Sequence, residues 1–460
     1  MRSARALAFA VSVLVLPRLA AGHGEAVSGF PSWPERVIHE WANRARVDPA
    51  IEMTACGAAC ADAANNCYQP IAPLWYASAL NRVARFHADN MGAQGFFAHD
   101  SHCKLVANLS TVYPTPCAGG AACACQTTPP ATCTYSGPSE PNPTCTRWSE
   151  RIALFGVSAG GEIIASSSDP NSAFYQWLFE SFPTATCAYV QGPPTNGHRW
   201  NILKRTGTFG AGVSGRAVGD FSGGGTAYKI PSGSHYPRQA ASLEVWANWA
   251  DSAGPQRAMV NVDGTCTALT MRRGSATNGA WSATLTGLGS GCHRYTFLFV
   301  DSTGATVAYP STGSLGIGPA GTCADWDTSQ PALGATCMAA PPPDAGVLPV
   351  DASVTPPVDS GVGPTVDGGV GPTVDGGTPR DGGAGVVDAA VASGDGGGAG
   401  EGDGGAGGDG DASAGTGSSS GCGCHAAGAR AGSGAPAGGL VGLALVGLLV
   451  LRRRRRRLPR

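Results

Sequence analysis

The distribution of cysteine most constrains how this chain of 460 residues can fold. Ten of its 16 cysteines lie between Cys56 and Cys187, four lie between Cys266 and Cys337, and two form the motif Cys422-Gly423-Cys424. Both larger groups are even in number, as full disulfide pairing in an oxidising compartment requires. The cysteines therefore predict two disulfide-stabilised regions that fold outside the cytoplasm.

The alternative use of these cysteines is a structural zinc site. Its candidate ligand pairs are Cys56-x3-Cys60 and Cys123-x-Cys125. Their surroundings lack the repeated C-x2-C or C…H spacing of zinc modules. Disulfides are therefore favoured, and the spacing leaves their connectivity open.

The first 22 residues have the pattern of a secretory signal peptide. Arg2 and Arg5 precede an apolar stretch from Ala6 to Leu16, and Ala20-Ala21-Gly22 provides small residues for cleavage. This apolar stretch is too short to span a bilayer core of about 30 Å. The N-terminus therefore predicts secretion.

The C-terminal residues 422–460 carry a second targeting pattern. An apolar stretch from Ala435 to Leu451 is about 25 Å long as a helix and is followed by an unbroken arginine run, Arg452–Arg457. Together with Cys422 and Cys424, this pattern resembles the myxobacterial C-terminal sorting signal. The resemblance implies membrane contact through the helix, processing near one of these cysteines, and attachment to the cell surface. A simple tail anchor is the alternative.

Composition divides the remaining chain into three parts. Residues 338–421 are rich in Pro, Gly and Asp and contain the repeat Val-Gly-Pro-Thr-Val-Asp-Gly-Gly, which predicts a disordered linker. Residues 238–337 alternate apolar and polar positions between turn signals, which predicts a small antiparallel β-sandwich of general Ig-like shape. Its tryptophans, Trp246, Trp249 and Trp281, are expected in the core of that sandwich.

Residues 32–220 mix helical and strand patterns. Apolar residues at helical spacing predict helices from Trp33 to Arg46, from Leu80 to Met91 and from Asn171 to Phe182, the last with Asp169 or Asn171 as its N-cap. His87 falls on the buried stripe of the second helix and is expected in the core. Short β-prone stretches surround Ile163 and Phe209–Val213. This region is predicted to be an α+β layered domain.

Four ionisable residues in this region could carry chemistry: His99, Glu162, Glu180 and His198. Two imidazoles and two carboxylates can bind a divalent ion or act as acid and base. A histidine at a helix end is more often a structural hydrogen-bonding group. Spacing alone does not show that the four side chains converge.

The motifs around these residues resemble the CAP superfamily, which comprises cysteine-rich secretory proteins, antigen 5 and plant pathogenesis-related proteins, and is also called the SCP domain. The order His, Glu, Glu, His is that of the family's central cleft. The matching segments are Phe96-Phe97-Ala98-His99, Glu150-Arg151-Ile152, Gly160-Gly161-Glu162, Trp177 with Glu180, and Gly197-His198-Arg199-Trp200-Asn201.

This resemblance implies an α-β-α sandwich whose groove, lined by histidine and glutamate, can hold a divalent cation such as zinc or calcium. It implies no settled enzyme, because CAP proteins act mostly as secreted effectors or binding modules, some of them for sterols and lipids. The chain departs from the family at Ile163, which replaces the usual asparagine, and in two cysteine-containing insertions, from about Cys103 to Cys145 and between Ser181 and His198. The insertions are expected to form disulfide-stapled flaps near the cleft.

Three functions remain open. The first is a surface-displayed binding module for a lipid, a peptide or a cell-envelope ligand. The second is a metal-assisted hydrolase of cell-wall or protein substrates, with His99 and His198 as ligands and Glu162 or Glu180 as base. The third is a structural envelope protein. Nucleic acid is disfavoured as a partner because 30 Lys+Arg against 32 Asp+Glu leave a net charge of −2 and no basic footprint.

Overall fold

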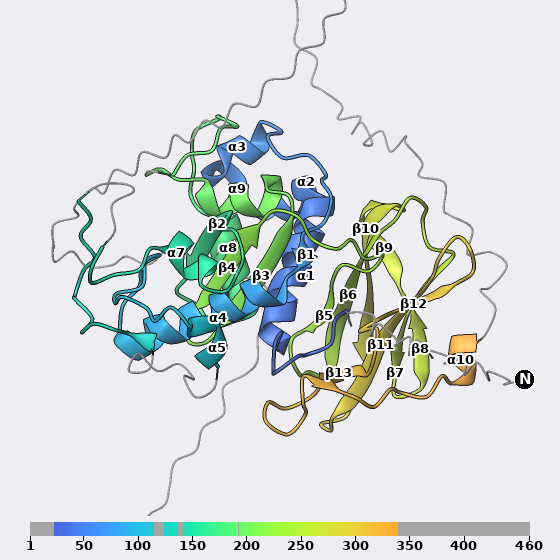
Figure 1. The fold of residues 1–460 in the computed structure, drawn as a ribbon. Coiled ribbons are helices and arrows are strands. Elements are labelled where there is room, and N and C mark those ends of the chain that lie inside the picture. Colours follow the sequence, from blue (N-terminus) through green and yellow to red (C-terminus); the bar gives the residue numbers. More distant parts are fainter. Residues whose placement is uncertain (1–22, 115–123, 137–141, 192, 339–460) are drawn as a thin grey trace, which may run out of the picture. The chain divides into compact units, whose positions relative to one another are not determined.

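The computed structural model describes residues 23–114, 124–136, 142–191 and 193–338, and these form a mixed α+β protein with three sheets (Figure 1). The predicted signal peptide, nearly all of the predicted linker, and the C-terminal targeting region with Cys422 and Cys424 lie outside the described residues. Within the described ranges no helix has the length and apolar character needed to cross a bilayer. The α+β class predicted from sequence is confirmed.

The first sheet has the strand order β1-β3-β4-β2, in which only the β1–β3 pair is parallel. Its strands are β1 (Trp75–Tyr76), β2 (Gly161–Ala165), β3 (Thr208–Val213) and β4 (Ala217–Ser222). The helical segments of this region are α1 (Trp33–Val47), α2 (Pro49–Met53), the 3₁₀ turn η1 (Thr54–Ala59), α3 (Ala61–Ala64), α4 (Ser78–Gln94), α5 (Leu109–Val112), α7 (Trp148–Ala153), α8 (Pro170–Leu178) and α9 (Gly197–Lys204).

Helix α1 follows the predicted apolar face and is buried well beyond it. Val37, Trp41 and Ala45 lie in the core, as their spacing predicts. The polar residues Glu40 and Asn43 are also fully buried. The sequence pattern indicates one covered face, whereas tertiary packing covers this helix on several sides.

Helix α8 ends earlier than its apolar pattern predicts. The predicted segment ran from Asn171 to Phe182, but the helix stops at Leu178. Beyond its end, Phe182 instead exchanges backbone hydrogen bonds with Ala59 and Ala61. Competition from this distant segment is the physical reason for the early end, and it places Glu180 in a loop. At the other end, Asp169 is the N-cap and accepts from Ser172 N at 2.8 Å.

Two further sheets follow in the chain. One has the order β5-β6-β10-β9, and the other has the order β14-β13-β11-β7-β8, with β12 paired to β11; all their pairings are antiparallel. Their elements are β5 (Gly233–Tyr236), β6 (Ser242–Ala250), β7 (Arg257–Val262), β8 (Thr265–Ala268), β9 (Thr270–Ser275), β10 (Asn278–Thr286), β11 (His293–Val300), β12 (Thr306–Tyr309), β13 (Ser314–Ile317) and β14 (Trp326–Asp327), followed by α10 (Ala335–Met338).

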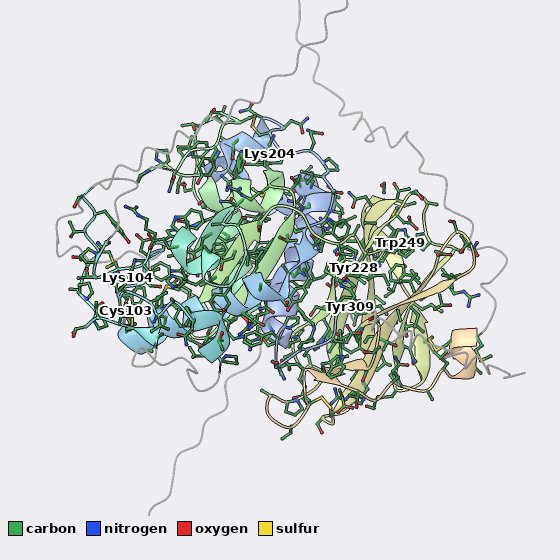
Figure 2. All side chains as sticks on the ribbon, viewed as in Figure 1. Cys103, Lys104, Lys204, Tyr228, Trp249 and Tyr309 are labelled. Atoms are coloured by element: carbon green, nitrogen blue, oxygen red, sulfur yellow. A yellow bond between two sulfur atoms is a disulfide. The ribbon has the colours of Figure 1, made fainter. Side chains whose placement is uncertain are left out.

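The tryptophans of β6 and β10 do not all lie in one core. Trp249, labelled in Figure 2, is fully buried between the two sheets. It stacks on Phe299 at 5.4 Å, and Trp281 packs at the edge of the same core. The prediction for Trp246 is wrong. Because side chains alternate along a strand, it lies on the opposite face of β6, where it meets Trp41 of α1 edge-to-face at 6.5 Å.

Disulfide pairing is confirmed among the described residues, where six bonds occur. They are Cys56–Cys60, Cys67–Cys187, Cys103–Cys125, Cys133–Cys145, Cys266–Cys337 and Cys292–Cys323. The zinc alternative fails for Cys56 and Cys60, which bind each other, and for Cys125, which binds Cys103. Cys117 and Cys123 lie outside the described residues.

Candidate functional site

The first predicted pair of site residues is in direct contact. His99 lies in the loop after α4, and its Nδ1 is 3.0 Å from Oε1 of Glu162 on β2. The His99 side chain is 44% exposed, whereas that of Glu162 is 1% exposed. A buried carboxylate therefore holds an imidazole ring that solvent and ligands can reach.

Arg151 of α7 keeps the buried Glu162 carboxylate charged. Its guanidinium pairs with Glu162 Oε2 and also donates to the His99 carbonyl at 2.9 Å and to Ser101 Oγ at 3.0 Å. Burial alone would raise the pKa of Glu162, but the charge of Arg151, followed by smaller effects of His87 and His99, lowers it. Arg151 thus positions the loop that carries His99 and stabilises the anion that holds its ring.

Two buried titratable groups lie near this pair and were not assigned to the site from sequence. Asp220 of β4 lies directly opposite Glu162 in the antiparallel pairing, and burial followed by the charge of Glu162 raises its pKa well above the ordinary range. His87, buried as predicted, donates or accepts through Nε2 at the Ala98 carbonyl, and burial lowers its pKa to about 3. The sequence signal that could have identified Asp220 is a single carboxylate within the fully buried strand Ala217–Ser222.

The second predicted pair is also in contact, but it lies at ion-pair distance without the hydrogen bond that joins the first pair. His198 Nδ1, at the start of α9, is 3.0 Å from Oε2 of Glu180, and the two side chains are 28% and 8% exposed. The distance is that of an ion pair, but Oε2 makes no hydrogen bond among the described residues. The other oxygen, Oε1, accepts from Arg199 N at 3.1 Å.

Arg199 links this second pair to the disulfide-bonded segment at 54–64. Its guanidinium forms a two-point ion pair with Asp62 of α3, at 3.0 and 3.2 Å, and approaches Cys60 Sγ at 3.3 Å. It also donates to the carbonyls of Leu178 and Glu180, at 2.8 and 2.7 Å. The loop that carries Glu180 is thereby fixed from beneath. Sequence motifs named Arg199 but did not predict Asp62 as its partner.

The four predicted residues are thus brought together as two His–Glu pairs. Within the described ranges there is no group of three or more His, Cys, Asp or Glu side chains placed to hold a metal ion. In both pairs the carboxylate faces Nδ1, which is the arrangement that orients a histidine to bind a cation through Nε2. Each pair thus leaves the Nε2 of one histidine unpaired with the carboxylate, and the donors in the described ranges do not form a protein cage around a cation.

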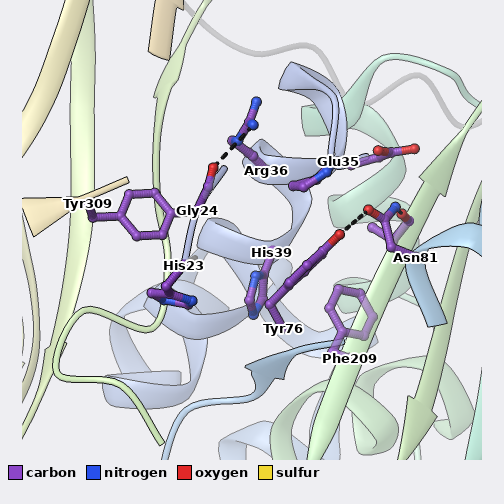
Figure 3. A pocket seen from close by; sticks show the side chains of 11 residues that line it. His23, Gly24, Glu35, Arg36, His39, Tyr76, Asn81, Phe209 and Tyr309 are labelled. Atoms are coloured by element: carbon purple, nitrogen blue, oxygen red, sulfur yellow. Dashed lines mark hydrogen bonds between the residues drawn. The ribbon is translucent and has the colours of Figure 1, made fainter. Parts of the chain in front are cut away.

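Two hollows occur in the described residues. One is a cavity of about 10 Å³ lined by His23, His39, Tyr76, Tyr309 and neighbouring residues (Figure 3), which has room for about one water molecule. The other is an open groove of about 370 Å³ lined by Met53, Cys60, Tyr68 and neighbouring residues. Neither is lined by any of the four predicted site residues.

Comparisons with protein-family models, with curated proteins and with solved structures found no match to this chain.

Proposed function

We propose that this chain is a secreted, surface-displayed binding module of the CAP type, with its ligand site at the two His–Glu pairs. One observation carries the proposal: each of two histidines from distant segments has a buried carboxylate 3.0 Å from its Nδ1, as a hydrogen bond for His99 and at ion-pair distance for His198, and the two histidine side chains stay 44% and 28% exposed. A purely structural histidine is expected to be covered, as His87 is. The order His, Glu, Glu, His and the mixed sheet with its helices support the CAP assignment.

Binding is favoured over hydrolysis by the charge state of Glu162. An efficient general base has a pKa near the working pH. The ion pair with Arg151 lowers the pKa of Glu162, which makes its carboxylate a weak base at neutral pH. The same ion pair suits a carboxylate whose task is to orient a histidine ring.

Zinc is the proposed cofactor, with His99 and His198 as the protein ligands. Calcium, the other ion that the resemblance implies, takes oxygen ligands and is not matched by two imidazole nitrogens. A bound cation would supply a positive centre for oxygen atoms of the ligand. Lipid, peptide and cell-envelope ligands remain the proposed partners. The six disulfides of the described residues support an oxidising compartment, and surface attachment rests on the C-terminal sequence pattern.

Zinc titration of the secreted protein, followed by calorimetry, tests this proposal. His99→Ala and His198→Ala are each expected to weaken zinc binding by at least about tenfold. His293→Ala is the matched control. His293 forms a similar pair, with Nδ1 2.6 Å from Asp263 Oδ2 and the side chain 22% exposed, but it lies on β11 and is not part of the proposed site. Equal zinc binding by all four proteins would contradict the cation site.

The binding role is tested separately by screening lipids, peptides and glycans against the secreted protein. A ligand whose affinity falls in His99→Ala or His198→Ala, and not in His293→Ala, would support it. A complete absence of ligands would favour the structural alternative. Hydrolysis of a screened substrate that is lost in Glu162→Gln would favour the enzyme.

A further inference from the structure

The first residue after the predicted signal peptide is docked on two distant segments of the chain. The His23 backbone N donates to Ser311 Oγ at 2.9 Å, and the His23 carbonyl accepts from Ser311 N at 2.7 Å. The ring stacks on Tyr228 with 3.7 Å between the centroids, and its Nε2 lies 2.6 Å from the Ile230 carbonyl. Only 7% of His23 is exposed. These directional contacts place His23 in a built site and not on a free stretch of chain.

The backbone of the next residue is fitted just as closely. Gly24 has a φ of +90°, and a Cβ added there would lie 2.8 Å from the Tyr309 ring and 2.9 Å from Pro310 Cα. Its carbonyl accepts from the Arg36 guanidinium at 3.3 Å (Figure 3). Glycine is the residue that combines a left-handed backbone with such a close approach. Residues 23–24 are therefore held between the end of β12 and α1.

Glu25, the following residue, has a carboxylate without a cation. Its Oε1 accepts from Ser311 Oγ at 2.6 Å and from Thr312 N and Oγ1 at 2.6 and 2.9 Å. Its Oε2 is buried and makes no hydrogen bond among the described residues, and no described lysine, arginine or histidine side chain forms an ion pair with it. The His23 ring does not supply the charge, since burial lowers its pKa to about 4 against smaller effects of the Ile230 carbonyl and Glu25. An unsatisfied carboxylate oxygen is unfavourable unless a donor or a cation reaches it.

Removal of the signal peptide supplies such a cation. Of the small residues at 20–22, only Gly22 has another small residue two positions before it, as the cleavage pattern requires. Hydrolysis of the Gly22–His23 peptide bond consumes one water, leaves a carboxylate on Gly22 and turns the His23 amide nitrogen into an α-ammonium. This group is protonated at neutral pH because its ordinary pKa is about 7.7–8.0. One N–H donor thus becomes three, with a positive charge, at a nitrogen already bonded to the hydroxyl that donates to Glu25.

We propose that the mature protein begins at His23 and that a preformed site binds its new α-ammonium. The ammonium donates to Ser311 Oγ and forms an ion pair with Glu25 across that hydroxyl. In the uncleaved chain the same nitrogen is a neutral amide, so Glu25 has no cation. Removal of the signal peptide therefore stabilises the fold, and the complete contact forms only after processing. The inference rests on the predicted signal peptide and is independent of the cation and of the two His–Glu pairs.

The test begins with intact mass spectrometry of the full secreted protein, which is expected to start at His23. Its melting temperature is then compared with that of Glu25→Gln and that of a chain with Ala-Ser inserted between Gly22 and His23. The insertion keeps the amide hydrogen bond of His23 and moves only the charge away, and glutamine keeps an accepting oxygen. Each change is expected to lower the melting temperature by about 3 °C or more, and the two together by no more than one alone, because both remove the same ion pair. Glu244→Gln, at an exposed position, is the control and should melt within about 1 °C of the parent.

Acylation of the α-amine at neutral pH gives a second readout, which a purely structural Glu25 would not change. An ion pair raises the pKa of an amine, so the parent N-terminus is expected to react about tenfold more slowly than that of Glu25→Gln, as measured by peptide mass spectrometry. A mature N-terminus at another residue, additive losses of melting temperature, or equal acylation rates would overturn the proposal. None of these results would alter zinc binding that depends on His99 and His198, so a failure here leaves the proposed function in place.

Discussion

At the scale of single residues, the buried charge of Glu162 determines how His99 is held. A carboxylate that is 1% exposed is unfavourable unless its charge is paired, and Arg151 supplies that charge from α7. The ion pair with Arg151 therefore keeps Glu162 charged and in place, and Glu162 in turn orients the imidazole of His99, whose side chain is 44% exposed. Replacing Arg151 should therefore change the orientation of the His99 ring, although the two residues belong to different elements.

Arg151→Met tests this buried pair. Removing one partner leaves an uncompensated buried charge, so the free energy of unfolding is expected to fall by about 3–5 kcal/mol, measured by urea unfolding at neutral pH. Lys104→Met is the matched control, since Lys104 and Glu150 pair at 3.4 Å with both side chains more than one-third exposed, and its expected cost is below about 1 kcal/mol. Similar losses in the two variants would contradict the assigned role of Arg151.

At the scale of elements, two glycines let α4 pack directly on β3. A Cβ at Gly210 would lie 2.1 Å from Asn81 N, and one at Gly212 would lie 1.9 Å from Arg85 N. Both contacts are with helix backbone, so neither can be relieved by a rotamer change. The close packing fixes the first half of α4, around Asn81 and Arg85, against β3. The loop carrying His99 follows the other end of the same helix.

Gly212→Ala is therefore expected to lower the free energy of unfolding by more than about 2 kcal/mol, because the helix must move away from the sheet. Gly223→Ala is the control: it has no atom within 4 Å of the added Cβ and needs no left-handed backbone. Its expected effect is below about 1 kcal/mol. Thermal and urea unfolding of both variants measure the difference. An unchanged free energy of unfolding in Gly212→Ala would contradict the prediction and show that α4 can move away from β3.

At the scale of the whole molecule, a buried polar contact connects α1 with β6. Asn248 Nδ2 donates to Glu40 Oε1 at 2.7 Å, and Glu40 is fully buried with Oε2 lacking a hydrogen bond among the described residues. Burial raises the pKa of Glu40 to about 7, against the smaller opposing effects of Ser232 and Asn248. The folded protein therefore holds this proton to higher pH than the unfolded chain does.

The pH dependence of Glu40→Gln tests that difference. Because the folded-state pKa lies above the unfolded value of 4.5, the contribution of Glu40 to stability is fully present below about pH 4.5 and is lost as the pH rises through about 7. Relative to the parent, Glu40→Gln should gain about 2–3 kcal/mol in unfolding free energy between pH 5 and pH 8. Glu244→Gln, at an exposed position, should show no such gain. A difference in unfolding free energy between Glu40→Gln and the parent that does not change with pH would contradict the raised pKa of Glu40.

Disulfides also act at the scale of the whole molecule, because their effect on the free energy of unfolding depends on the length of the chain loop that they close. The Cys67–Cys187 bond spans 120 residues, and Cys56–Cys60 spans four. Loop-closure entropy predicts a loss of about 5 kcal/mol on replacing the first pair by alanine and about 2 kcal/mol for the second. Urea unfolding of the two double variants compares them, and equal losses would mean that local packing outweighs the entropy of the unfolded chain.

The sequence by itself determined the features that depend on local pattern and residue type. Cysteine parity indicated disulfides, apolar spacing located α1 and α4, alternation indicated the later strands, and motifs named His99, Glu162, Glu180 and His198. These signals are read within a short stretch of chain, where side-chain period and backbone preference act.

Only the tertiary structure decided which partners those residues meet. Arg151 beside Glu162, Asp62 beside Arg199, Tyr189 over Gly197, Trp246 against Trp41 and the early end of α8 all depend on contacts with other segments. The energies involved come from burial and from the pairing of desolvated charges. Both exist only after distant segments have packed, so no local pattern specifies them.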